Sequence, residues 1–404
     1  MTGTVRRGPE EVVFLAAKRT AFGSFGGSLR TLTATELATF SAQAALETSR
    51  IEPDAIGHVV YGNALQTSAD AMYLARHVAL RAGTPESTPA VTVNRLCASG
   101  FQAITQAAQE ILLGTADAAL AGGTESMSQA PHVIRGARWG ELRLGAEGHF
   151  EDMLWQALRD SHCGMAMGET AEEVASRYGV TREESDRVAL RSHERAAAAW
   201  DGGRFTAEVV PVRVPTRTGS VEIGCDEHIR RDATIEGLAR LRPFFREDGL
   251  VTAGSASGMG DGAASVVLAS RSWAEASGIE PLGRILSYAY VGVDPRIMGI
   301  GPVPAIRQAL ARGGVTLAEM DLVEVNEAFA PQYLAVEKAL ALDPDQTNVD
   351  GGAIALTHPL AASGTRITVH LLHELRRRGG GLGVGAACVG GGQGGAIVLE
   401  AFGA

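Results

Sequence analysis

Two stretches of the chain share one pattern: LCASGFQAITQAAQEILLG at residues 96–114 and LAASGTRITVHLLHELRRRG at residues 360–379. Each carries Ala-Ser-Gly near its start, and apolar residues recur every three or four positions after it, as on one face of an α-helix. Each ends in a glycine, Gly114 or Gly379, which suits the left-handed turn that closes many helices. The sequence therefore predicts two helices that belong to two copies of one unit.

The segments on both sides of each helix repeat as well. The first helix lies between the apolar runs AIGHVVYGNAL (55–65) and ADAALAGGTES (116–126). The second lies between EMDLVEVNEAF (319–329) and LGVGAACVGGG (382–392). Short apolar runs bounded by turn residues are typical of buried strands. Strands that alternate with helices in two copies predict an α/β fold of two similar layers packed together.

Residues 125–249 interrupt this symmetry. They contain an acidic helical stretch at 168–200 and the β-like run EVVPVRVP at 208–215. Insertions of this kind often carry the loops that cover a binding site. We expect a first half at 1–124 and 250–274, an inserted loop domain at 125–249, and a second half at 275–404.

Composition excludes several classes of protein. The chain has 404 residues, with 46 acidic against 36 basic side chains, a net charge of −10 and 4 cysteines. Net acidity argues against nucleic acid as the main ligand, and so few cysteines indicate reduced thiols. No apolar run reaches the roughly 18 residues of a membrane span, and the run at 12–17 is too short for a secretion signal. We expect a cytoplasmic protein that binds no membrane.

Two cysteines and a histidine stand at the turns that the repeat predicts. Cys97 opens the first helix, where the helix N-terminus and backbone N–H groups are expected to lower its pKa and make it a nucleophile. Cys388 ends a strand and precedes the glycines 390–392, whose amides can approach a reacting group. His358 precedes the second helix, so it could face Cys97 as a base. The alternatives are a small buried thiol for Cys97 and an ordinary turn histidine for His358.

At this point four blocks of the sequence closely resemble the signature motifs of the thiolase family. They are VNRLCASG (93–100), NEAF (326–329), GGAIALTHP (351–359) and CVGGG (388–392). The resemblance extends over nearly the whole chain, through RTAFGSFGG (19–27), LRPFF (241–245) and TAGSASGMGDGAA (252–264). It implies an αβαβα sandwich of duplicated layers with an inserted loop domain that covers a coenzyme A site. It also implies a thiolase, an acyltransferase that joins two acetyl-CoA into acetoacetyl-CoA and CoA, or cleaves a 3-ketoacyl-CoA in reverse.

The resemblance assigns a role to each catalytic residue. Cys97 resembles the nucleophile that carries the acyl group as a thioester in a ping-pong mechanism, and His358 resembles the base that activates it. Cys388 resembles the acid/base that acts on the α-carbon. Asn326, otherwise read as a plain Asx turn, resembles the residue that holds a water in one oxyanion hole. The amides of Gly390 and Cys97 resemble the other hole. Contacts to coenzyme A are implied for Leu158, Met167, Arg230, Ser257 and Phe329.

Partners and cofactors follow from the same resemblance. Acetyl-CoA and other acyl-CoA molecules are implied as substrates, with no permanently bound cofactor and no metal. The pairs His162-Cys163 and Cys225-x-x-His228 lie in polar loops, which argues against a zinc site. The family implies a homotetramer built as a dimer of dimers.

Four positions depart from the family pattern, among them Asp350, which stands where asparagine is common. Thr357 and Ala361 stand where the family usually has glycine, and a β-branched threonine is strained if its backbone needs a positive φ. Ala166 stands where short-chain biosynthetic members often have histidine, which permits longer acyl chains. Two alternatives remain open: a ketoacyl synthase, which has a second histidine near Asn326 and typically lacks the thiol of Cys388, and a catalytically silent scaffold, which Thr357 would favour.

Overall fold

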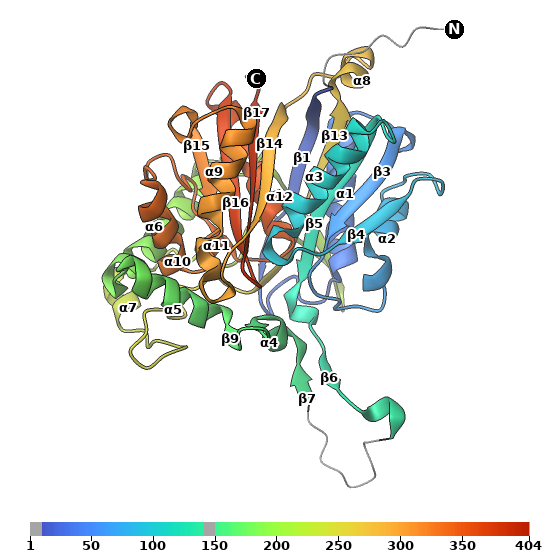
Figure 1. The fold of residues 1–404 in the computed structure, drawn as a ribbon. Coiled ribbons are helices and arrows are strands. Elements are labelled where there is room, and N and C mark those ends of the chain that lie inside the picture. The colour runs from blue at the N-terminus through green and yellow to red at the C-terminus, as the bar shows by residue number, and fades with distance from the viewer. Residues whose placement is uncertain (1–9, 141–149, 404) are drawn as a thin grey trace.

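The computed structural model describes residues 10–140 and 150–403, in which two similar halves pack on each other (Figure 1). The strands of the first half are β1 (Val12–Thr20), β3 (Ile56–Gly62), β4 (Ala90–Val93), β5 (Ala118–Ser126) and β13 (Gly260–Ser270). Those of the second half are β14 (Gly283–Gly292), β15 (Leu322–Val325), β16 (Gly381–Val389) and β17 (Gln393–Ala401). The larger helices of the halves are α1 (Ala34–Ser49), α2 (Leu74–Arg81), α3 (Ser99–Leu112), α9 (Pro302–Gly313), α10 (Ala330–Leu340) and α12 (Ala362–Arg377).

Strand pairing follows the same scheme in both halves. β5 is parallel to β3 and antiparallel to β13, which in turn is antiparallel to β1. In the second half β16 is parallel to β15 and antiparallel to β17, which is antiparallel to β14. Even the parallel pairing of β3 with β4 has a counterpart, a parallel bridge between Val323 and Thr347. The repeat predicted from the sequence thus extends over the whole of each sheet.

Helices separate and cover the sheets in five layers. α1 packs on β1 and β13 at one outer face, and α9 packs on β14 and β17 at the other. α3 and α12 lie between the sheets, where α12 contacts both β13 and β16. The central core is made largely of side chains from these two helices and the inner sheet faces. Buried strands such as β13 have no exposed residue, which explains their apolar sequence.

The two central helices touch at their N-terminal ends. A β-carbon at Gly100 of α3 would lie 2.5 Å from the backbone nitrogen of Thr365, and one at Gly364 of α12 would lie 2.6 Å from that of Phe101. Only glycine allows such a close backbone approach. The glycine of Ala-Ser-Gly in both copies is therefore required by the contact between the copies themselves.

The two sheets meet along a short edge. β1 and β14 pair only through Val13 with Arg284 and Phe14 with Gly283. This contact joins the two sheets into one continuous order, β15-β16-β17-β14-β1-β13-β5-β3-β4, with the short β2 (Gly23–Ser24) and β10 (Val209–Val210) at its side.

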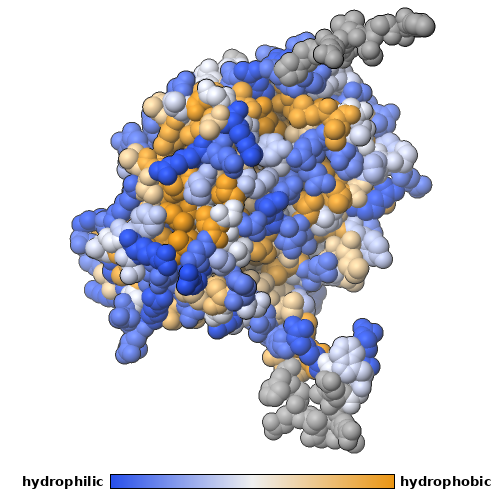
Figure 2. Space-filling view, viewed as in Figure 1, coloured by the Kyte–Doolittle hydropathy of each residue, from blue (hydrophilic) through white to orange (hydrophobic). Residues whose placement is uncertain are grey.

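Short strands and four helices form the described part of the region between β5 and β13. They are β6 (His132–Ile134), β7 (Phe150–Asp152), α4 (Met153–Ala157), β8 (Arg159–Asp160), β9 (Met165–Ala166), α5 (Met167–Tyr178), α6 (Arg182–Asp201), β11 (Val212–Thr216), β12 (Gly219–Ile223) and α7 (Ile235–Ala239). The helical stretch expected at 168–200 is two helices, because Gly179 ends α5 with φ 59° and Thr181 caps α6. β6 and β7 form an arm that leaves the body of the molecule (Figures 1 and 2). None of the helices in the described residues is long and apolar enough to cross a bilayer.

Candidate active site

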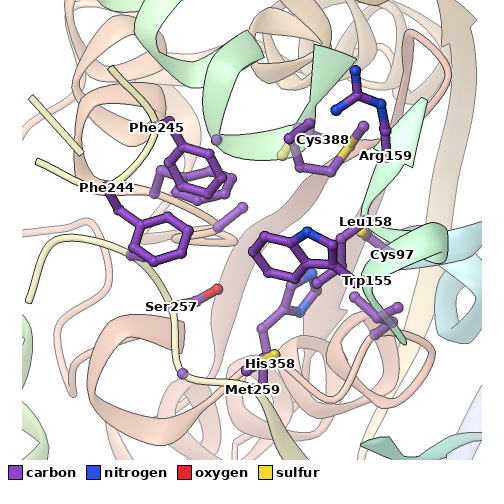
Figure 3. Close-up of a pocket in the computed structure, with 18 of the residues that line it drawn as sticks. Cys97, Trp155, Leu158, Arg159, Phe244, Phe245, Ser257, Met259, His358 and Cys388 are labelled. Carbon is purple, nitrogen blue, oxygen red and sulfur yellow. The ribbon is translucent and has the colours of Figure 1, made fainter. Parts of the chain in front are cut away.

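One cavity of about 250 Å³ brings the chemical groups of both halves together. Cys97 reaches it from the short 3₁₀ turn Leu96–Ala98 before α3, and Cys388 from the end of β16. His358 reaches it from the turn between α11 (Ala353–Leu356) and α12. In Figure 3 the two cysteines and the imidazole surround one space, as the sequence repeat predicts.

Segments outside the repeat complete the wall of this cavity. Figure 3 shows Phe244 and Phe245 on the side opposite the cysteines, with Trp155 between them and Cys97. Four of the five residues expected to contact coenzyme A line the same space: Leu158, Met167, Ser257 and Phe329. The fifth, Arg230, is exposed and lies outside the cavity lining. The cavity thus has an apolar, partly aromatic wall around two thiols and an imidazole.

Hydrogen bonds fix the imidazole of His358. Its Nδ1 lies 2.5 Å from the hydroxyl of Ser363, and that hydroxyl donates to the carbonyl of Pro359. Because the proton of Ser363 is engaged there, the imidazole donates from Nδ1 and keeps a lone pair on Nε2. Asn326 Nδ2 lies 3.3 Å from Nε2. The orientation therefore presents Nε2 as a proton acceptor.

Burial determines the charge of this imidazole. Burial, together with the nearby guanidinium of Arg366, lowers the pKa of His358 to about 3. Near neutral pH the ring is therefore uncharged, which is the state that a base requires.

The thiol of Cys97 differs from the sequence prediction in one respect. Burial raises the pKa of Cys97 to about 11, although N–H groups of Gly390 and of Cys97 itself act in the opposite direction. The expected lowering by the helix N-terminus was wrong, because the loss of hydration outweighs the backbone donors. Cys97 is a neutral thiol in the free site and needs a base to become a nucleophile.

Cys388 is also a neutral thiol. It is fully buried, and burial raises its pKa strongly, with the proximity of Cys97 as a second cause. All four cysteines of the chain are free, as the sequence predicts. The site thus holds its two thiols and its imidazole without any net charge.

Two sets of groups can bind a developing oxyanion. The N–H groups of Gly390 and Cys97 point to the Cys97 thiol. Asn326, next to His358, is fully buried, and its Oδ1 has no hydrogen-bond partner within the described residues. An unpartnered buried oxygen of this kind is a place for an ordered water.

Thr357, which departs from the family pattern, has a strained backbone. Its φ is 77° and its ψ is 168°, a region that is essentially reserved for glycine. Ala361, the second departure, has an ordinary φ of −74°. Thr357 nevertheless leaves the imidazole of His358 inside the cavity, and the His358 amide donates to the carbonyl of Gly258.

The sequence analysis did not predict some residues of the site. The role of Ser363 could have been found from the repeat, because Ser99 occupies the same place in the first copy and bonds both Arg95 and Leu96 around Cys97. The aromatic wall of Trp155, Phe244 and Phe245 has no such counterpart. In the part of the chain that the structure describes, no three His, Cys, Asp or Glu residues are grouped so that they could hold a metal ion.

Comparison with known protein families identifies the family to which this chain belongs. Residues 12–272 match the thiolase N-terminal domain, and residues 279–401 match the thiolase C-terminal domain. The chain belongs to the thiolase family. The family, its acyltransferase class and the duplicated αβαβα fold, all predicted from the sequence, are confirmed.

Several members of the thiolase family resemble this chain over nearly its full length. A mitochondrial 3-ketoacyl-CoA thiolase of Bos taurus is 54% identical, over 96% of this chain and 98% of that protein. An acetyl-CoA acetyltransferase of Chromobacterium violaceum is 48% identical, over 96% of this chain and 99% of that protein. The crystal structure of human mitochondrial 3-ketoacyl-CoA thiolase in complex with CoA has a TM-score of 0.94 and 52% identity, over 97% of this chain and 98% of that one.

Proposed function

We propose that this protein transfers acyl groups between thiols by way of a thioester on Cys97, as a thiolase that acts on acyl-CoA substrates. The observation that supports this most strongly is the convergence of Cys97, His358 and Cys388 on one cavity. Carbon–carbon bond formation between two thioesters needs one group to hold the acyl electrophile and another to make a carbanion. Two thiols beside a neutral imidazole supply both groups.

In the first step Cys97 Sγ attacks the carbonyl carbon of an acyl-CoA, and its proton passes to Nε2 of His358. The bond from the carbonyl carbon to the CoA sulfur then breaks, and Cys388 gives its proton to that sulfur. CoA leaves as a thiol, and the site keeps the acyl group with a thiolate beside an imidazolium. The amides of Gly390 and Cys97, with a water held by Asn326, would stabilise the oxyanions, a contribution of about 10²–10³ in rate for each donor.

In the second step the Cys388 thiolate removes a proton from the α-carbon of acetyl-CoA. The resulting carbanion attacks the acyl carbon on Cys97, the new carbon–carbon bond forms, and the bond to Cys97 breaks. His358 returns its proton to the Cys97 sulfur, so that every group regains its starting state. Thiolysis of a 3-ketoacyl-CoA is the same sequence in reverse.

Different residues are proposed to contact the coenzyme portion and the acyl portion of the substrate. Leu158, Met167, Ser257 and Phe329 line the cavity that holds the thiols, and we assign them to the pantetheine chain and Arg230 to the more polar part of coenzyme A. Ala166 also lies on the cavity wall. Its small side chain favours acceptance of acyl groups longer than acetyl.

The two alternative functions, a ketoacyl synthase and a silent scaffold, would require different residues in the site. A ketoacyl synthase would have a second histidine where Asn326 lies and would not need the buried thiol of Cys388. Asn326 and Cys388 therefore support a thiolase. A silent acyl-CoA-binding scaffold would retain the cavity but form no thioester, and acylation of Cys97 distinguishes the two.

The decisive experiment is mass spectrometry of the protein after incubation with acetyl-CoA. We expect one acetyl group on Cys97 in the wild type and none in Cys97→Ser, because an alcohol cannot replace a thiol as nucleophile near neutral pH. Cys388→Ala should still acquire the acetyl group, although more slowly, because CoA then has to leave as a thiolate. It should lose condensation and thiolysis by about 10²–10⁴-fold, the usual contribution of an acid or base.

Cys163→Ala serves as a control, since its thiol lies outside the cavity lining. It should behave as the wild type in both assays. A wild-type protein that binds CoA without acetylation would favour the scaffold, and equal loss of both steps in Cys388→Ala would contradict the division between the thiols.

Assembly and location rest on the sequence predictions. A homotetramer arranged as a dimer of dimers remains our proposal from the family resemblance, and a cytoplasmic location remains our proposal from composition. The bovine relative is named as a mitochondrial protein.

A further inference from the structure

A buried carboxylate lies beside the site and takes no part in the chemistry proposed above. Glu125 is near the end of β5 and has no exposed surface. Within the described residues it forms no ion pair. Burial raises the pKa of Glu125 to about 7, while the amides of Leu65, Ala361 and Ala64 that donate to it act in the opposite direction. A buried carboxylate without a cation is costly and needs an explanation.

The two oxygens of Glu125 accept hydrogen bonds from both halves of the molecule. Oε1 accepts from the side chain of Asn63 at 2.9 Å and from the amide of Leu65 at 2.9 Å. Oε2 accepts from the amide of Ala64 at 3.1 Å and from the amide of Ala361 at 3.1 Å. One carboxylate thus holds a turn of the first half and a turn of the second half.

In the second half, the hydrogen bond from Ala361 to Glu125 fixes the turn that carries His358. Ala361 is three residues after His358 and stands at the N-cap of α12, where its own side chain cannot bond the free amides. The carboxylate of Glu125 accepts instead from the amide of Ala361 itself, at the helix end that favours a negative charge.

On the side of the first half, a short chain of bonds leads to the nucleophile. The carbonyl of Ala64 accepts from the side-chain amide of Asn94 at 3.1 Å. The side-chain oxygen of Asn94 in turn accepts from the amide of Leu96 at 2.9 Å, next to Cys97. The 63–65 turn that Glu125 holds therefore supports the turn that carries the thiol.

We propose that Glu125 is a positioning residue that fixes the Cys97 turn against the His358 turn, through Ala64 and Asn94 on one side and Ala361 on the other. The proposal rests on the thiolase function above, because it assumes that a proton passes between Cys97 and His358. Such a transfer needs both groups at a defined separation.

Glu125→Gln tests this role with little change of shape. The glutamine keeps one acceptor oxygen, but its NH₂ group faces two donors, so one of the two turns loses its contact. Because a misplacement of about 1 Å can cost about 100-fold in rate, we expect kcat to fall by about that factor, with KM for acetyl-CoA unchanged. The single-turnover rate of Cys97 acetylation, followed by mass spectrometry, should fall in parallel.

Glu374→Gln is the matched control for stability. Glu374 is a buried carboxylate at the far end of α12, paired with Arg377 and Arg378. We expect it to lower the thermal midpoint and leave kcat at the wild-type value. If Glu125→Gln likewise lowers only the midpoint, the positioning role is refuted.

Asn94→Ala keeps the proposal testable if Glu125→Gln does not fold. It removes the link between Ala64 and Leu96 while the carboxylate stays in place, and kcat should fall with KM unchanged. A wild-type kcat in Asn94→Ala would overturn the proposed path. Absence of acetyl on Cys97 in the wild-type protein would refute the thiolase function itself, whereas normal acetylation in the wild type and in both variants would refute only the role of Glu125.

Discussion

Thr357 shows how a single residue of the site carries a structural cost. Its backbone adopts a conformation suited to glycine, its side chain is buried, and its hydroxyl has no partner within the described residues. A residue in such a region costs about 1–3 kcal/mol and persists only where its surroundings enforce it. Here the enforcing contacts are the His358 amide bond to Gly258 and the packing of Thr357 against Gly260.

We expect Thr357→Gly to raise the free energy of unfolding by about 1 kcal/mol. Relief of the strained backbone outweighs the greater flexibility that glycine gives the unfolded chain, about 0.5–1 kcal/mol. Equilibrium unfolding in urea measures the change. Thr365→Gly, a buried threonine inside α12, is the control and should lower stability, since glycine is unfavourable within a helix. A loss of stability in Thr357→Gly would show that its side chain contributes more by packing than its backbone costs.

The pKa of Cys97 makes a prediction about reactivity. Because burial raises that pKa to about 11, the thiolate fraction is small near neutral pH and increases as the pH rises. We expect the rate of Cys97 alkylation by iodoacetamide to rise about tenfold per pH unit between about pH 7 and pH 9, as the thiolate fraction does well below the pKa.

Peptide mapping identifies the alkylated residue, and acetyl-CoA should protect Cys97 by occupying the cavity. A rate that stays constant from about pH 6 to pH 8 would instead indicate a thiolate paired with an imidazolium in the free enzyme. Preferential labelling of Cys163 or Cys225 would contradict the assignment of the reactive thiol.

At the scale of elements, the crossing of α3 and α12 links the fold to the site. Each helix begins directly after a turn that carries a chemical group, and the helices touch at those ends. Gly364→Ala would bring a β-carbon within 2.6 Å of the Phe101 amide. We expect a loss of about 1–3 kcal/mol in the free energy of unfolding, the usual cost of overpacking, together with a lower kcat.

Gly292→Ala is the control for this substitution. Gly292 ends β14, and a β-carbon there would meet no atom within 4 Å. Urea unfolding and steady-state assays on both variants separate the effect of the helix crossing from that of adding a methyl group. Unchanged stability in Gly364→Ala would mean that the helices can move apart without consequence.

The repeat allowed α3, α12 and the strands around them to be predicted, because their apolar spacing and terminal glycines are local signals. The break between α5 and α6 was missed, although Gly179 and Thr181 are recognisable end and start signals. The aromatic wall of the cavity and the raised pKa of Cys97 could not be predicted in this way. Both depend on segments that are distant in sequence and on the water that they exclude.

At the scale of the whole molecule, sequence reasoning found two similar α/β layers but not the order of their strands. β1 pairs with β13, which is more than 200 residues further along the chain, and nothing local in either strand indicates the other. The five-layer arrangement came from the family resemblance. The neighbours of Cys97 and His358 across the junction, including Glu125, became visible only with the folded chain.

The position of β13 late in the sequence has a consequence for the synthesis of this protein on the ribosome. β5 is buried along its whole length and takes β13 as a neighbour, yet β13 emerges more than 130 residues after it. At a synthesis rate of about 5–20 residues per second, the backbone edge of β5 stays without its partner for on the order of ten seconds. During that interval the nascent chain exposes unpaired N–H and C=O groups of β5. We expect chaperones that shield this edge until translation has passed residue 270 to increase the yield of folded protein.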